Sequence, residues 1–200
     1  MADERTYRDK RDLGATPEPS GEAPVPPPDG DPRFVVQQHD ASSMHWDLRL
    51  EADGVLRSWA VPKGPSTDPR DKRLAHQVED HPVDYLTFEG VIPAGQYGGG
   101  SVIVWDLGTY RNRTTGDDGQ EVPVADAVEA GHLSVDLDGR KLRGGYALTR
   151  FRGEDDWLLV KERDDHADAR RRPTSTEPRS VLSGRTNDEV AAAEEGDEGS

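Results

Sequence analysis

The sequence predicts a mainly β protein, a small antiparallel barrel or sandwich with short flanking helices and disordered ends. From Met44 to Glu51 apolar and polar residues alternate without exception, which is the period of a half-buried strand. Further short apolar runs follow at regular intervals, and Gly and Asp turns separate them. Only residues 125–130 carry a convincing helical pattern. Many short strands with hairpin signals favour an antiparallel sandwich or small barrel.

The first half of this architecture is predicted from three strands joined by hairpins. Residues 34–39 form the first strand, and a short loop of turn residues connects it to the strand at 44–51. Asp53-Gly54 is a strong two-residue hairpin signal, so Val55 to Val61 should pair back.

The second half is predicted with less regular spacing. A strand that begins at Arg73 should stop at Asp80-His81-Pro82, and Tyr85 to Glu89 should extend again. The loop from Ile92 to Gly100 is dense in glycine but lacks a following Gly-Lys-Ser/Thr, which excludes a P-loop nucleotide site. Four later strands are predicted at residues 101–106, 133–137, 145–151 and 157–162.

The composition of the 200 residues fits one domain whose ends do not pack. Only 32% of the residues are hydrophobic, while 21 are glycine and 15 are proline. We therefore expect an amino-terminal arm and Pro-rich linker over residues 1–31, a folded domain over 32–165, and a disordered acidic tail over 166–200.

The charge and the absence of cysteine limit the possible functions. Zero cysteines exclude disulfides and thiolate metal sites, so His and carboxylates are the available metal ligands. The net charge is −15, and residues 33–163 hold 16 Lys and Arg against 22 Asp and Glu. This balance excludes a basic groove along a duplex but leaves room for a pocket for one phosphate. No apolar run has membrane-spanning length and the charged amino end does not resemble a signal peptide, so we expect a cytoplasmic protein.

The predicted strand at 44–51 carries the residues with the clearest chemical potential. His45, Asp47 and Arg49 share one of its faces, and the hairpin can bring His39 beside them. Two interpretations remain open. The two imidazoles and the carboxylate can form a divalent-metal site with open positions, with Arg49 beside it to hold an anion. Alternatively, these residues line a solvated strand face on which Asp47 pairs with Arg49.

Five motifs in order resemble the 3'-phosphoesterase domain of bacterial DNA ligase D. The resemblance covers about residues 5–165, and the motifs are FVVQQHDA (34–41), HWDLRLE (45–51), SWAVPKGP (58–65), EDHPVDY (79–85) and FEGVIPAGQYG (88–98). Because we find no ligase or polymerase segment beside them, we expect a stand-alone form with a separate ligase or polymerase as partner.

The resemblance implies a small antiparallel β-barrel and a manganese-dependent enzyme of non-homologous end joining. Such an enzyme acts on DNA 3' ends, including the RNA-tipped ends of a primer-template. It removes a terminal ribonucleoside to leave a 3'-phosphate, and then removes that phosphate to leave a 3'-hydroxyl. The rivals are a β-barrel Fe(II) oxygenase with the same metal ligands and a non-catalytic module that binds DNA ends.

The same resemblance assigns roles to residues of this chain. The metal ligands fall on His39, His45 and Asp47. Contacts to the phosphate and the transition state fall on Arg49 and His81, with Tyr85 alongside. Supporting substrate or catalytic positions fall on Gln37, Lys63, Arg73 and Glu79. Positions of the amino-terminal arm that fold back over the site fall on Arg11, Asp12 and Glu18.

Overall fold

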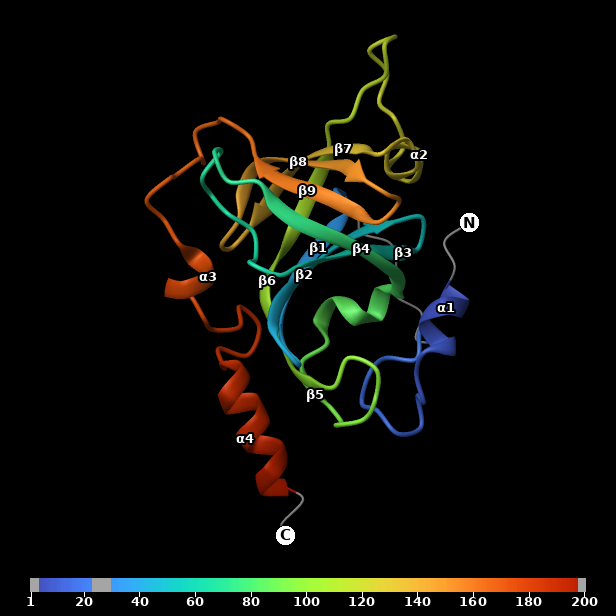
Figure 1. The fold of residues 1–200 in the computed structure, drawn as a ribbon, viewed down its shortest axis with the longest axis vertical. Helices are drawn as coiled ribbons and strands as arrows, with labels where there is room; N and C mark the ends of the chain where they lie inside the picture. The colour runs from blue at the N-terminus through green and yellow to red at the C-terminus, as the bar shows by residue number, and fades with distance from the viewer. Residues whose placement is uncertain (1–3, 23–29, 198–200) are drawn as a thin grey trace.

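The computed structural model describes residues 4–22 and 30–197, and its centre is a closed antiparallel β-barrel (Figure 1). Eight strands form the ring in the order β1-β2-β3-β4-β9-β8-β7-β6, and β6 pairs with β1 to close it. The short strand β5 (Gly90–Ile92) joins only the β6 side of this sheet. The ring strands are β1 (Arg33–Asp40), β2 (Met44–Ala52), β3 (Val55–Val61), β4 (Arg73–Pro82), β6 (Gly100–Asn112), β7 (His132–Gly139), β8 (Arg143–Arg152) and β9 (Asp156–Lys161). The prediction of a mainly β barrel is therefore confirmed.

Alternation along the strands explains how the interior of the closed sheet is filled. One large apolar cluster takes buried side chains from all eight ring strands, so these side chains fill the barrel. Trp46, Trp59, Trp105 and Trp157 belong to this cluster, and the last three are fully buried. The apolar members of the alternating run at 44–51 thus point inward, and its polar members point outward.

The two predicted hairpins position the polar row. In the β1/β2 ladder His39 lies opposite His45, and Gln37 lies opposite Asp47. The β2/β3 turn at Asp53 and Gly54 takes positive φ angles of 52° and 80°, as an Asp-Gly hairpin requires.

An outer layer covers the face of the barrel that carries these polar residues. It contains helix α1 (Glu4–Asp9), the 3-10 helix η1 (Val83–Thr87) and β5. A second apolar cluster joins them to the barrel and includes Tyr7, Val35, Leu56, Tyr85 and Phe88. As a result, the outward row is not solvated: Asp47, Arg49 and Glu51 are all buried.

Two predicted segments near residue 80 differ in the structure. Strand β4 does not stop before Asp80 but continues through Pro82, with His81 paired to Leu56 on β3. Tyr85 lies in η1 rather than in an extended segment. Pro82 ends the strand, and the turn after it folds η1 back over the sheet.

The prediction of a disordered tail is wrong for residues 166–197. This part contains α3 (Pro173–Thr176) and α4 (Asn187–Asp197), and it is fastened to the barrel by polar bonds. Asn187 is buried and its Nδ2 donates to the carbonyls of Gln38 and Ser101. The low hydrophobic content misleads here because the packing uses backbone carbonyls. The helix predicted at 125–130 is present as α2 (Val124–Ala130).

The proline run at 24–28, within the predicted linker, lies outside the described residues. Among the described helices, none combines the length and apolar character that crossing a membrane requires.

Candidate metal and phosphate site

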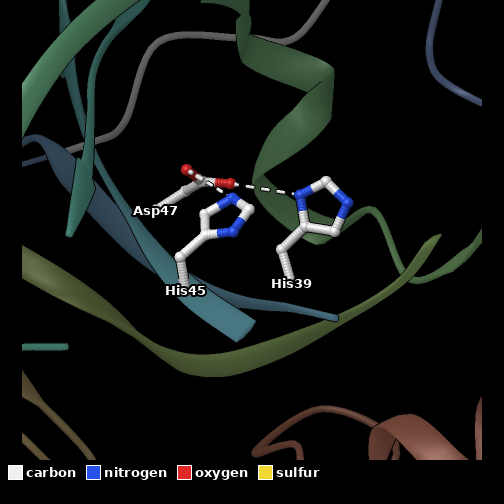
Figure 2. A group of neighbouring side chains, drawn as sticks. All are labelled: His39, His45 and Asp47. Atoms are coloured by element: carbon white, nitrogen blue, oxygen red, sulfur yellow. Dashed lines mark ion pairs between the residues drawn. The ribbon is translucent and has the colours of Figure 1, made fainter. Parts of the chain in front are cut away.

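Three side chains converge on the outer face of the β1/β2 hairpin. One potential ligand atom from each of His39, His45 and Asp47 lies within 4.8 Å of the other two (Figure 2). His39 Nδ1 is 3.7 Å from Asp47 Oδ2, and His45 Nε2 is 3.6 Å from Asp47 Oδ1. Ligands about 2.1 Å from a common divalent ion are separated by such distances after small shifts, so the residues present fit a metal.

Backbone carbonyls determine which nitrogen of each histidine faces the carboxylate. Nε2 of His39 donates to the carbonyl of Gly98 at 2.7 Å, and Nδ1 of His45 donates to the carbonyl of Ser43 at 3.0 Å. In the neutral imidazoles the nitrogens that face Asp47 therefore carry lone pairs. These lone pairs and the carboxylate are then available to one cation, and metal-ligating histidines are commonly held this way, by a hydrogen bond from the other ring nitrogen.

Asp47 remains ionised despite its burial. Burial alone would raise the pKa of its carboxyl, but the adjacent charge of Arg49 and the two imidazoles hold the pKa below its ordinary value. Arg49 Nη2 donates to Asp47 Oδ2 at 3.2 Å. Asp47 therefore pairs with Arg49, as the second interpretation expected, but on a buried face rather than a solvated one, and it also faces the two histidines.

The guanidinium of Arg49 is fixed on two sides and unpartnered on the third. Its Nε donates to Gln37 Oε1 at 2.8 Å, and its plane lies over the ring of Tyr85, 4.9 Å from the centroid. Its Nη1 is buried without a hydrogen-bond partner. A buried guanidinium donor without an acceptor is costly, and a phosphate oxygen is the acceptor that it matches best.

Gln37 holds Arg49 in place and does not point toward open space. Its amide nitrogen donates to the carbonyls of Tyr85 and Phe88, each at 3.0 Å. Both termini of its side chain are therefore occupied within the protein.

His81 is neutral and oriented by its neighbours. Its Nδ1 donates to the carbonyl of Glu79 at 2.9 Å, which leaves Nε2 to accept from Arg11 Nη2 at 3.3 Å. Burial, followed by the charges of Arg49 and Arg11, holds the pKa of His81 well below its ordinary value.

The amino-terminal arm lies against this cluster. Arg11 bonds to Glu18 at 2.8 Å and to Glu79 at 3.1 Å, and Glu18 also accepts from the hydroxyl of Tyr85 at 2.8 Å. Burial opposes ionisation of Glu79, but its hydrogen bonds with its own backbone, Arg11 and Lys10 lower its pKa. The pKa of the Tyr85 hydroxyl is raised well above 10 by burial and by Glu18, so it stays a donor.

Three residues that the resemblance assigned to the site lie outside this hydrogen-bonded cluster. Asp12 is exposed, and its carboxylate bonds to the backbone of Gly14 within its own turn. Arg73 is at the opposite end of β4 from His81 and pairs with Asp71 at 2.9 Å. Lys63 is exposed just beyond the end of β3. Their roles remain predictions.

Sequence reasoning missed the backbone groups that orient the site. The carbonyls of Ser43 and Gly98 select the histidine nitrogens, and neither is marked by a side chain. The tight glycine loop at 95–100 was the available signal, because such loops allow a close backbone approach.

The fold and the site together define a class of protein. A closed β-barrel carries two histidines and one carboxylate as a candidate metal centre, beside a buried arginine suited to an anion. More specifically, the chain belongs to the DNA Ligase D 3'-phosphoesterase domain family, which it matches over residues 37–150.

Relatives extend the similarity along the chain. It is 52% identical over 185 residues to the multifunctional non-homologous end joining protein LigD of Pseudomonas aeruginosa, which covers 90% of this chain and 21% of the relative. It is 46% identical over 159 residues to the LigD repair protein of Mycobacterium tuberculosis, covering 79% and 20% of the two chains. For LigD of Mycolicibacterium smegmatis the identity is 40% over 164 residues, covering 80% and 20%. The chain thus spans about a fifth of the length of these relatives.

Proposed function

We propose that this protein is a manganese-dependent phosphoesterase that heals DNA 3' ends for non-homologous end joining. It first removes a 3'-terminal ribonucleoside and leaves a 3'-phosphate, and it then removes that phosphate and leaves a 3'-hydroxyl. The observation that carries the proposal is the unpartnered Nη1 of Arg49 next to the converging ligand atoms of His39, His45 and Asp47. Membership of the phosphoesterase domain family and similarity to end-joining proteins support it.

His39 Nδ1, His45 Nε2 and an oxygen of Asp47 would hold the manganese ion, which supplies Lewis acidity toward a phosphate oxygen when bound. Nitrogen and carboxylate ligands suit several divalent ions, including manganese. The single buried donor of Arg49 without a partner suits one phosphate, and the negative charge of the chain argues against a long track of phosphate contacts.

Arg49 binds the phosphate through the donor that has no partner in the protein. Gln37 and Asp47 fix the other nitrogens of the guanidinium, so Nη1 is aimed without a further loss of side-chain freedom. The positive charge then stabilises the charge that develops on the phosphoryl oxygens as the ester bond breaks.

His81 acts first as an acceptor at Nε2, because its proton lies on Nδ1 and is engaged by Glu79. A bound phosphate anion raises the pKa of this imidazole, which allows proton donation to the departing oxygen. In the first reaction a water oxygen bonds to phosphorus, the bond to O5' of the terminal ribonucleoside breaks, and O5' receives a proton. In the second a water oxygen bonds to phosphorus and the bond to O3' breaks, and O3' receives a proton.

The test is a primer-template with one 3'-terminal ribonucleotide, incubated with and without Mn²⁺ and resolved into 3'-phosphate and 3'-hydroxyl products. His45→Ala should reduce both products to the background level and abolish Mn²⁺ binding measured by electron paramagnetic resonance. His45 is only half-buried and its loss removes one local bond, so circular dichroism should show an intact fold. His132→Ala, which removes an exposed histidine of β7, is the matched control and should remain active.

Retained activity in His45→Ala would refute the metal assignment. End binding by the wild type without release of phosphate would favour the non-catalytic module. Oxygen-dependent turnover without phosphate release would favour the oxygenase.

A further inference from the structure

Tyr97 is an exposed aromatic side chain next to Gly98, whose carbonyl orients His39, and the candidate site does not otherwise use it. Its exposed fraction is 49%, whereas Tyr7, Tyr85, Tyr110 and Tyr146 are buried. The loop between β5 and β6, which contains this residue, lies beside the amino-terminal segment (Figure 1), and Lys10 of that segment lies over the Tyr97 ring. A single exposed aromatic carries no argument alone, so its surroundings decide its meaning.

The loop connects Tyr97 to both halves of the site. The next residue, Gly98, accepts the hydrogen bond that orients His39. On the other side the Arg11 guanidinium lies 5.3 Å from the centroid of the Tyr97 ring, and the same guanidinium contacts His81. Tyr97 is therefore adjacent in sequence to the residue that orients His39, and it contacts the arginine that contacts His81.

Two turns define the backbone of the loop around Tyr97. Gln96 N–H donates to the carbonyl of Pro93, and Gly99 N–H donates to the carbonyl of Gln96, each at 3.1 Å. Gly98 has a positive φ of 76° between these turns. A loop whose backbone is defined in this way loses little further backbone freedom when a ligand packs against its side chain.

The cavity beside Tyr97 favours an uncharged ligand group over a phosphate. It has a volume of about 810 Å³ and is also bordered by Lys10 and Glu79. Its lining holds six carboxylates and three Lys or Arg side chains, the carboxylates being Glu79, Asp80, Asp126, Glu129, Glu154 and Asp155. The acidic excess repels a nucleic-acid backbone but accepts the amino groups of a neutral base.

We infer that Tyr97 stacks against the nucleobase of the 3'-terminal nucleotide whose phosphate is processed at the adjacent site. The inference rests on the proposed function and adds how the enzyme holds the end of the strand. Stacking on an aromatic ring is available to every base, so Tyr97 supports binding without a sequence preference. Lys10 Nζ and Arg11 Cζ lie over the ring, 5.1 and 5.3 Å from its centroid, so the base stacks on the part of the ring that remains exposed.

The test compares two primer-templates that each carry a 3'-phosphate, one with a terminal adenine and one with a terminal abasic sugar. Steady-state kinetics are measured with the full chain and saturating Mn²⁺. On the adenine primer Tyr97→Ala should lower kcat/KM by about tenfold or more, mainly through KM, because base stacking on a ring is lost. Tyr97→Phe and Tyr97→Trp should stay within roughly threefold of the wild type, since both keep a stacking face.

The abasic primer separates stacking from a structural role of the loop. If Tyr97 stacks on the base, the difference between the wild type and Tyr97→Ala should nearly disappear on this primer. Phe151→Ala is the matched control, because Phe151 is also 49% exposed but lies on β8, and it should act like the wild type on both primers.

An equal loss by Tyr97→Ala on both primers would overturn the inference, since it would mean that Tyr97 supports Arg11 or the loop. A wild type that releases no phosphate from either primer would overturn the proposed function itself. The two failures are therefore distinguishable.

Discussion

At the scale of single residues, the hydrogen bonds that a charged side chain makes within the protein determine which of its atoms can bind a ligand. Arg49 could pair with any nearby carboxylate, but Gln37 and Asp47 together engage only two of its three nitrogens. The third, Nη1, is buried and has no acceptor. The chemistry of the site therefore depends on Gln37, a neutral residue with no direct reactive role.

Gln37→Ala should damage both stability and activity. It removes the acceptor of Arg49 Nε and the donor to two buried carbonyls, at a cost of about 1–3 kcal/mol for each polar group left unsatisfied. We expect a loss of about 2–4 kcal/mol in the free energy of unfolding, measured by urea titration. The misaligned Arg49 should also weaken inhibition of the phosphatase reaction by inorganic phosphate.

Gln38→Ala provides the control for this prediction. Gln38 is the next residue of β1 and points to the opposite face, where its amide donates only to the sulfur of Met44. Its substitution should leave phosphate inhibition unchanged. If both variants weaken that inhibition equally, Gln37 does not position Arg49.

The sequence could predict which residue types lie together at the site, but it could not predict their bonds. A period of two places His45, Asp47 and Arg49 on one face, and the hairpin register adds His39. The resemblance also assigned Lys63 and Arg73, which lie outside the bonded cluster. How far each side chain extends into the site, and which histidine nitrogen faces Asp47, depend on the positions of backbone carbonyls. A residue pattern does not encode these positions.

At the scale of elements, strands were predictable where alternation was clear and misread where local turn signals competed with pairing. Asp80-His81-Pro82 resembles a strand end, but pairing with Leu56 and Val55 keeps β4 extended through Pro82. This extension is what carries His81 to the site. The tertiary pairing therefore outweighed the local preference of a proline-containing tripeptide.

The carboxy-terminal segment differs from its prediction in another way. Its polar sequence predicted disorder, but the segment packs against the barrel. Lys141 is 8% exposed and its Nζ donates to the carbonyls of Glu177 and Arg179, at 2.8 and 2.6 Å. The indole nitrogen of Trp105 also donates to the carbonyl of Glu177. A count of apolar residues cannot detect an attachment made by donors on the barrel and carbonyls on the segment.

This attachment predicts an unusual dependence of stability on pH. Burial, reinforced by Arg171 and opposed by Asp106 and Glu177, lowers the pKa of Lys141 to about 8. Between about pH 8 and the ordinary pKa of a lysine near 10.4, the unfolded chain binds more protons than the folded one, so the contribution of Lys141 to stability rises with pH. Relative to Lys141→Met, the wild type should gain about 1–2 kcal/mol in the free energy of unfolding between pH 7 and pH 9.5.

Urea titrations of the two proteins at both pH values measure this gain. Lys72→Met is the control, because Lys72 is exposed and its substitution should give the same difference from the wild type at both pH values. A constant difference for Lys141→Met as well would show that Lys141 titrates at its ordinary pKa.

At the scale of the whole molecule, the residues that stabilise the barrel lie inside it, and the residues of the candidate site lie outside it. Its interior is filled by one apolar cluster from all eight ring strands, whereas the candidate site lies on the outside between the sheet and the amino-terminal arm. The closed sheet fixes the register of the β1/β2 hairpin, and the arm excludes water from the polar row. Such an arrangement holds the site rigidly without a polar cavity inside the core.

The distribution of charge over the molecule predicts how binding depends on salt. The chain carries a net charge of −15, and the candidate site offers few cations that could contact a phosphate. Each phosphate contact made by a cation lowers the logarithm of the binding constant by about 0.9 per logarithmic unit of salt on a duplex and about 0.7 on a single strand. With one or two such contacts, the KM for a 3'-phosphate primer-template should rise by about tenfold or less between 50 and 200 mM salt, compared with about 10³-fold or more for proteins that make six to ten contacts. Steady-state kinetics over this range, with Mn²⁺ held saturating, measure the slope, and a rise of several hundredfold would mean that a basic track outside the described cluster grips the duplex.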